Sequence, residues 1–140
     1  MLLSRKGILA VAAVIDVALH GQDRPVSAKA LAGRHQLPPR HLEPVLQALV
    51  HDGILKGVRG PRGGYELGRE QNEITADQIL RAAGSSDNGL AQDFPTSEIV
   101  NGVVLPAVVE AERAFGAALG MINIEDLVRL AQARAPAKKV

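Results

Sequence analysis

The sequence predicts a mainly α-helical fold that carries one small β-hairpin. Apolar residues recur at helical spacing between residues 42 and 50, and again between residues 99 and 122. Between these stretches, a loop with three glycines and one proline separates two short runs that suit β-strands. Helix, short turn, helix and hairpin is the order of a winged helix-turn-helix, so we expect that domain followed by a long C-terminal helix.

The first expected helix begins after Ser4, which can cap it, and runs to about Leu19, with Gly21 as its stop. Its interior is apolar nearly all round, so it should be buried on more than one side, and part of it is a candidate for contact with a second subunit. Arg5 and Lys6 stand at its start, where backbone N–H groups and the positive end of the helix dipole can hold a phosphate.

Two more helices form the expected helix-turn-helix. Ser27 can cap the first of them, and residues 33–37 are expected to form the turn. Pro44 interrupts the bonding of the second, so we expect regular helix from about His41, after a lead-in turn at residues 38–40. One apolar face of this second helix comprises Leu42, Val45, Leu46, Leu49 and Val50.

Polar side chains of the same helix lie off this face. Arg40 can pair with a guanine edge or a phosphate, and Glu43 can accept a hydrogen bond from a cytosine amino group. A glutamate that faces DNA weakens contact with phosphates, so it would serve base choice. The alternative is a half-buried surface helix with ordinary charges.

The hairpin is expected from residues 54–58 and 65–67, with residues 59–64 as its loop. A connection of this length is looser than a two-residue turn, so its tip should project. Arg59 and Arg62 lie on the tip, where arginines can enter a narrow minor groove or clamp phosphates. A solvated turn with incidental charge fits the loop equally well, and it is the preceding helix that favours DNA.

The chain divides into four expected parts. Residues 1–84 form the winged domain, which closes with a helix at about residues 75–84. Residues 85–98 are the clearest loop in the chain. Residues 99–134 are expected to form dimerisation helices, and residues 135–140 a frayed tail.

The helical pattern over residues 99–122 is interrupted near Gly102 and Pro106, where we expect a kink or a late start. A small domain cannot easily bury so apolar a helix, so we expect it to pair with its copy across a twofold axis. Packing within one chain is the alternative. A last helix should follow, capped by Asn123. The expected interface residues are Ile99, Val103, Val104, Val108, Phe115, Leu119 and Ile122.

Composition limits the possible functions. Lysine and arginine outnumber acidic residues by 10 to 6 in residues 1–70, whereas acidic residues outnumber them by 9 to 6 in residues 71–140. This asymmetry fits a DNA-binding half joined to an assembly or sensing half. The absence of cysteine excludes disulfides, thiol switches and thiolate-held clusters. The three aromatic residues are too few for single-strand stacking, and the four histidines lack paired metal spacing.

Signals for catalysis or export do not stand out. No nucleophile–base pair is evident, and residues 60–64 lack the lysine and the following helix of a P-loop, so we expect no enzyme. The opening run contains Asp16 and no small-residue cleavage site. No apolar run is long enough to span a bilayer. We therefore expect a cytoplasmic protein.

A resemblance to the BadM/Rrf-type winged-helix repressors rests mainly on the segment LEPVLQALVHDGILKGVRGPRGGYELGRE. That family includes the iron–sulfur cluster regulator, the nitric-oxide-sensing repressor and the cysteine metabolism regulator. The family's first helix is similar to SRKGILAVAAVIDVALHG, and its closing helix to GMINIEDLVRLA. The resemblance covers nearly the whole chain, and it implies a homodimer that binds an imperfect palindrome in promoters.

Carried over position by position, the resemblance implies recognition-helix contacts at Arg40, His41, Glu43 and Gln47, and wing contacts at Arg59, Gly60, Pro61, Arg62 and Gly63. The expected DNA-contacting set is completed by Arg5, Lys6 and Ser27. Cluster-binding members carry three cysteines before the dimerisation helix, where this chain has SSDNGLAQDFPTS, so we expect no iron–sulfur cluster and no other cofactor. A small-molecule effector or a partner protein remains compatible with the sequence.

The sequence thus predicts a homodimeric, sequence-specific transcription regulator, with repression as its expected effect. The alternative is a protein-interaction module that uses the winged fold without reading DNA, in which Arg40 and Glu43 would contact a protein.

Overall fold

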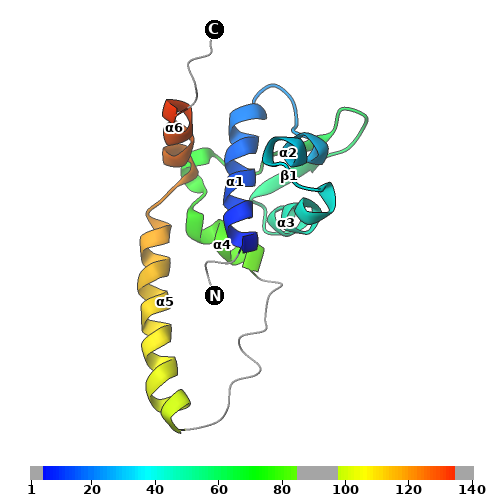
Figure 1. The fold of residues 1–140 in the computed structure, drawn as a ribbon. Coiled ribbons are helices and arrows are strands. Elements are labelled where there is room, and N and C mark those ends of the chain that lie inside the picture. The colour runs from blue at the N-terminus through cyan, green and yellow to red at the C-terminus, as the bar shows by residue number, and fades with distance from the viewer. Residues whose placement is uncertain (1–4, 85–97, 135–140) are drawn as a thin grey trace.

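The computed structural model describes residues 5–84 and 98–134 (Figure 1). Helix α1 stands at the centre, with α2, α3 and the hairpin on one side and α5 and α6 on the other. This confirms the winged helix-turn-helix that the sequence predicts. The expected Ser4 cap, the loop at 85–97 and the tail at 135–140 lie outside the described residues. The elements are α1 (Arg5–His20), α2 (Ala28–His35), α3 (Pro39–His51), β1 (Leu55–Val58), β2 (Gly64–Leu67), a 3-10 turn (Gln71–Glu73), α4 (Ala76–Gly84), a π-helical turn (Val100–Val104), α5 (Leu105–Gly120) and α6 (Ile124–Arg134).

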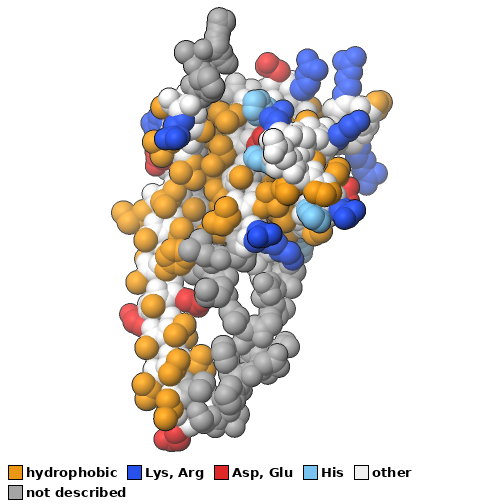
Figure 2. All heavy atoms as spheres, in the orientation of Figure 1, with side chains coloured by type: hydrophobic (Ala, Val, Ile, Leu, Met, Phe, Trp, Pro, Cys, Tyr) orange, Lys and Arg blue, Asp and Glu red, His pale blue; other side chains and the backbone are white. Residues whose placement is uncertain are grey.

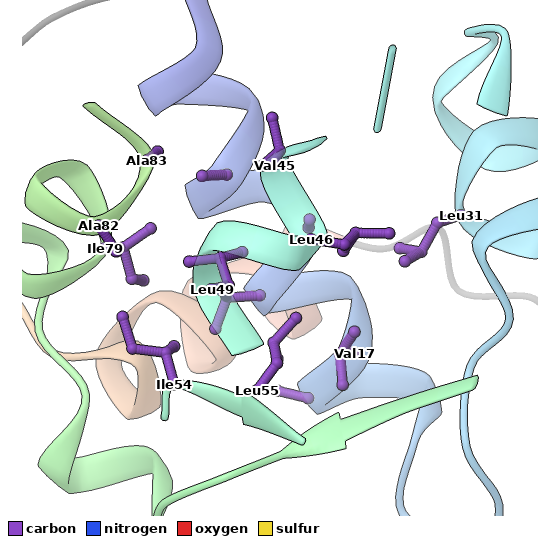
Figure 3. Close-up of a cluster of buried hydrophobic side chains, with 14 of the residues drawn as sticks. Val17, Leu31, Val45, Leu46, Leu49, Ile54, Leu55, Ile79, Ala82 and Ala83 are labelled. Carbon is purple, nitrogen blue, oxygen red and sulfur yellow. The ribbon is translucent and has the colours of Figure 1, made fainter. Parts of the chain in front are cut away.

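The main core lies between α1, α2, α3, β1 and α4. Figure 3 shows Val17, Leu31, Leu46, Leu55 and Ile79 pointing toward one another from these five elements. Helix α1 contacts α3, α4 and α6, as expected for a helix that is apolar nearly all round. Each fully buried leucine or isoleucine contributes about 1.5–3 kcal/mol, so this cluster holds the winged domain together.

Helix α2 begins at the predicted cap. The Ser27 Oγ accepts a hydrogen bond of 3.0 Å from the Ala30 N–H. The helix continues through His35 and ends where Gln36 adopts a left-handed backbone (φ 57°, ψ 46°). The prediction of a turn at 33–37 was therefore wrong in extent, because the first three of those residues are helical.

Helix α3 begins at Pro39, two residues earlier than predicted, so Pro39 and Arg40 of the expected lead-in turn are helical and Pro38 is the N-cap. The His41 N–H bonds to the Pro38 carbonyl at 3.0 Å. Pro44 lies inside it and has no N–H, so the Arg40 carbonyl receives no bond from this position. Only one bond near the helix start is lost. The apolar face is buried as predicted at Leu42, Val45, Leu46 and Leu49.

The hairpin is antiparallel, and its register pairs Leu55 with Leu67. Two more backbone bonds tie β2 to the segment before α2: Val26 N–H to the Tyr65 carbonyl (2.9 Å) and Tyr65 N–H to the Val26 carbonyl (2.8 Å). Gly64 permits this approach, because a Cβ there would lie 2.4 Å from the Val26 oxygen. The wing and the helix-turn-helix are therefore one unit.

Helix α5 starts late, as predicted. The π-helical turn covers Val100–Val104, and Pro106 explains the irregularity, because it offers no N–H to the Gly102 carbonyl. The regular helix ends at Gly120 rather than at the predicted Ile122. The following helix α6 is capped as predicted, since the Asn123 Oδ1 accepts a bond of 2.9 Å from the Asp126 N–H.

Helices α5 and α6 pack differently on the rest of the chain. Helix α6 buries Ile124 and Val128 in the main core. Helix α5 contacts α4 through Phe115 and Leu119. Leu119, which the sequence assigns to a dimer interface, is only 9% exposed and belongs to a cluster within its own chain.

Candidate nucleic-acid interface

Helix α3 and the wing together form the candidate surface. A groove of about 400 Å³ runs between them. It brings Gln47 of α3 together with the wing tip, two of the regions that the sequence singles out. Its lining residues are Gln47, Val50, Gly57, Val58, Arg59, Gly60, Gly63, Gly64 and Tyr65.

The polar residues of α3 point away from the core. Arg40, His41, Glu43 and Gln47 are all exposed, while the apolar residues between them are buried. Within the described residues, none of these four side chains forms a hydrogen bond or an ion pair. Their donors and acceptors are therefore available to an outside partner.

The wing tip is a tight turn that presents two arginines. The Gly63 N–H bonds to the Gly60 carbonyl at 2.9 Å, and Gly60 has φ +110°, a backbone conformation that favours glycine. A Cβ on Gly63 would lie 2.1 Å from the Val58 oxygen, so glycine is needed there to close the turn. Arg59, Pro61 and Arg62 are exposed on this tip.

Cations without a carboxylate partner gather in the winged half. The described structure pairs Arg34, Lys56, Arg81, Arg113 and Arg129 with acidic side chains. Those without an ion pair among the described residues are Arg5, Lys6, Arg24, Lys29, Arg40, Arg59, Arg62 and Arg69, which bonds only an amide and a backbone carbonyl, together with Arg134 on α6. Figure 2 shows Lys and Arg side chains clustered over the side where the wing and α2 lie. Such uncompensated positive charge attracts phosphate.

Not every expected contact lies beside the wing. Arg5 and Lys6 are exposed at the start of α1, and Figure 1 places that end of the helix far from the projecting wing loop. This separation depends on how α1 crosses the domain, which no local sequence pattern indicates.

Tyr65 is a residue of this surface that sequence reasoning used only as a strand signal. It lines the groove between α3 and the wing. Burial, and then the negative charge of Glu43, raise the pKa of its phenol above the usual 10.0. A tyrosine hydroxyl is protonated at neutral pH and can donate a hydrogen bond, and the shift is in the direction that keeps it so.

A buried charge cluster also escaped the sequence analysis. Asp16 of α1 is 5% exposed and accepts bonds from Arg34, with Nε–Oδ2 at 2.9 Å and a second guanidinium nitrogen 2.6 Å from Oδ1. The His35 Nε2 lies 3.1 Å from its Oδ2. The hydrogen bond to Asp16 raises the pKa of Arg34. This cluster ties α1 to the end of α2, and a lone acid inside an apolar helix was its only sequence signal.

Comparison with known proteins decides the family. The family model described as "Rrf2: Iron-dependent Transcriptional regulator" matches residues 3–130. The chain belongs to the Rrf2 family of transcriptional regulators. The resemblance stated from the recognition helix and the wing is thereby confirmed.

Individual Rrf2-type proteins give the same picture. The HTH-type transcriptional regulator IscR of Photobacterium profundum is 40% identical over 86 residues, which are 61% of this chain and 50% of that protein. The chain thus spans about half the length of the curated relatives it matches. The T. potens IscR structure is 30% identical, with a TM-score of 0.74 over 95% of this chain and 90% of the other. CymR, the global cysteine regulator of B. subtilis, is 26% identical, with a TM-score of 0.68 over 91% and 96%.

The family description raises the question of iron, and the residues present do not fit a thiolate-held iron–sulfur cluster. The chain contains no cysteine to supply the thiolates. Within residues 5–84 and 98–134, no group of three or more histidines and acidic residues could hold a metal ion.

Among the helices of residues 5–84 and 98–134, none has the length and apolar character that crossing a membrane requires.

Proposed function

We propose that this Rrf2-type chain is a homodimeric, sequence-specific repressor that binds palindromic promoter sites in the cytoplasm, without an iron–sulfur cluster. The observation that carries the proposal is the surface made by α3 and the wing tip. It combines exposed polar side chains on a helix with two arginines that no described carboxylate neutralises. A helix for the major groove beside a basic wing is the arrangement of duplex-reading proteins.

The proposed contacts divide into base reading and backbone binding. Arg40, Glu43 and Gln47 would meet base edges in the major groove, with His41 beside them. Arg59 and Arg62 would enter the minor groove or bind phosphates, with Gly60, Pro61 and Gly63 shaping the tip. Phosphates would be bound by Arg5, Lys6 and Ser27.

The proposed dimer rests on the exposed apolar surface around α5. Side chains of this region are largely open to solvent, at 68% for Ile99, 64% for Val103, 45% for Val104 and 47% for Val108. Figure 2 shows apolar side chains along the length of α5. A second copy would cover them and set two reading surfaces on one palindrome. Ile122, 36% exposed, would lie at the edge, while Phe115 and Leu119 would mainly hold α5 on α4.

Capture of genomic fragments on the purified chain, followed by anisotropy titration of the captured duplexes, tests the proposal. We expect tight binding that falls steeply with salt, because phosphate contacts release counterions. Arg59→Ala with Arg62→Ala should weaken binding by a few kcal/mol. The control variant, Arg129→Ala with Arg134→Ala, also removes two positive charges, but from α6 rather than from the α3–wing surface. It should change duplex binding little.

Three results would count against this function. Unaltered operator affinity in the wing double variant would remove the wing from the site. Capture of proteins but no enriched DNA would favour the protein-interaction alternative. Bound promoters that are transcribed equally well with and without the protein would exclude repression.

A further inference from the structure

A second groove lies on the other side of the wing tip. It has a volume of about 640 Å³ and separates the tip from the loop after α1 and the start of α2. Gly63 lines both this groove and the one between α3 and the wing, so the two meet at the tip. The lining residues are His20, Arg24, Pro25, Val26, Ser27, Ala30, Arg34, Pro61, Arg62 and Gly63.

The backbone holds the two walls of this groove at a set spacing. Val26, on the α2 side, exchanges both backbone bonds with Tyr65 at the base of the wing. Gly64 lets the two backbones meet at that point. The groove is therefore formed before any partner binds, which lowers the entropic cost of binding.

The chemistry of the lining favours an anion. Arg24 on one wall and Arg62 on the other have no ion pair within the described residues, and neither Asp nor Glu lines the groove. Arg34 adds a guanidinium that is 38% exposed although Asp16 binds it from within. The Ser27 Oγ accepts the Ala30 N–H, which leaves the Ser27 hydroxyl proton available to an acceptor oxygen.

We propose that this groove holds the sugar-phosphate backbone of the bound duplex, with Arg24 and Arg62 binding phosphate oxygens from opposite walls. The inference rests on the proposed DNA-binding function and adds Arg24, which the sequence pattern did not single out. A free phosphate compound shares this chemistry. A DNA strand is favoured because the groove is continuous at Gly63 with the α3–wing surface, so one duplex can occupy both.

The test compares Arg24→Ala with Arg134→Ala, which removes another exposed arginine that lacks an ion pair, but from α6. Anisotropy titrations use a captured operator and a mixed-sequence duplex over a series of salt concentrations. Arg24→Ala should weaken both duplexes by a similar factor, about 5- to 10-fold, and lower the salt slope by about one. Arg24→Lys should restore the slope, and Arg134→Ala should match wild type.

A second arm separates the two sources of phosphate. Pyrophosphate is titrated into wild type and Arg24→Ala by calorimetry without DNA. Pyrophosphate binding that Arg24→Ala abolishes, combined with unchanged duplex binding in that variant, assigns the groove to a free anion and overturns the proposal. Arg24→Ala that behaves like Arg134→Ala on both duplexes overturns it as well, with the DNA-binding function intact. Failure of wild type to bind any duplex overturns the groove and the proposed function together.

Discussion

Helices α3 and α5 both carry rows of aliphatic side chains, and they place them in opposite environments. Helix α3 buries Leu42, Val45, Leu46 and Leu49 against α1, β1 and α4, and its polar face is open. In α5, only Gly116 and Leu119 are buried. The core of the winged half is therefore closed, with help from Ile124 and Val128 of α6, whereas most of α5 is uncovered within the described chain. One sequence thus joins a region whose apolar side chains are mostly buried to a helix that leaves most of its own exposed.

The winged half and the α5–α6 region also differ in how many of their cations form ion pairs. Cations of the winged half remain without carboxylates at the wing and α3, while Arg113 and Arg129 bond acids three residues before them in the sequence. Each of these two pairs on α5 and α6 carries no net charge. Uncompensated charge on the wing favours a polyanion.

The largest effect is expected from Val104→Asp combined with Val108→Asp. Two carboxylates in an apolar contact would separate the dimer, because burying unpaired charge is costly. Operator affinity should then fall by about 100-fold or more, since each half-site would bind one subunit independently. Analytical ultracentrifugation measures the assembly, and anisotropy measures operator binding.

Ala117→Asp is the matched control for that pair. Ala117 is exposed and lies two and a half turns after Val108, so it faces the opposite side of α5. It adds a carboxylate to the same helix and should leave the dimer intact. A Val104→Asp/Val108→Asp protein that still sediments as a dimer would show that this row is not the contact, and that α3 and α5 do not differ as described.

The attachment of the wing is tested by Gly64→Ala. The added Cβ would lie 2.4 Å from the Val26 oxygen, so the two Val26–Tyr65 bonds must lengthen or break. We expect a loss of about 2–4 kcal/mol in the free energy of unfolding, measured by urea denaturation. Gly57→Ala on β1 meets no atom within 4 Å and should change stability by less than about 0.5 kcal/mol. Equal stability of Gly64→Ala and Gly57→Ala would mean that the wing is held less closely to the segment before α2 than the Val26–Tyr65 bonds indicate.

The buried carboxylate of α1 is tested by Asp16→Ala. Its loss leaves the Arg34 guanidinium and the His35 ring without their partner. Removing one member of a fully buried ion pair typically costs about 3–5 kcal/mol in the free energy of unfolding. The cost is smaller here, because the Arg34 side chain is 38% exposed and water replaces part of the lost contact. We expect about 2 kcal/mol of destabilisation by denaturant unfolding. A double-mutant cycle with Arg34→Ala should show coupling above about 1 kcal/mol, and zero coupling would contradict the assigned pair.

Local sequence signals predicted the elements of the winged half well. Ser27 marks the start of α2 by chemistry that acts over three residues, as Asn123 does for α6 in the C-terminal half. The spacing of Leu42 to Leu49 determines which face of α3 is buried. Contacts between distant segments left no comparable signal. The pairing of Val26 with Tyr65 depends on how the wing folds back, and the groove of Arg24 exists only because of that pairing.

The C-terminal half was harder to predict for a related reason. The apolar spacing of α5 indicates a buried face but does not say which neighbour buries it. In the structure, Phe115 and Leu119 pack against α4, whereas Val104 and Val108 are exposed. Pro106 correctly indicated an irregular start, because its missing N–H is a property of the residue itself.

The smallest effect is expected from Arg113→Ala on α5. Its partner Glu110 is three residues earlier, and the two side chains are 71% and 74% exposed. Such pairs contribute little, so we expect less than about 0.5 kcal/mol in denaturant unfolding and no change in assembly. If Arg113→Ala lowered the free energy of unfolding as much as Asp16→Ala does, the Arg113–Glu110 pair would be shielded from water in the assembled protein. The partner surface on α5 would then extend from the Val104–Val108 row to the side that carries Arg113, and α5 would be as closed in the dimer as α3 is in the monomer.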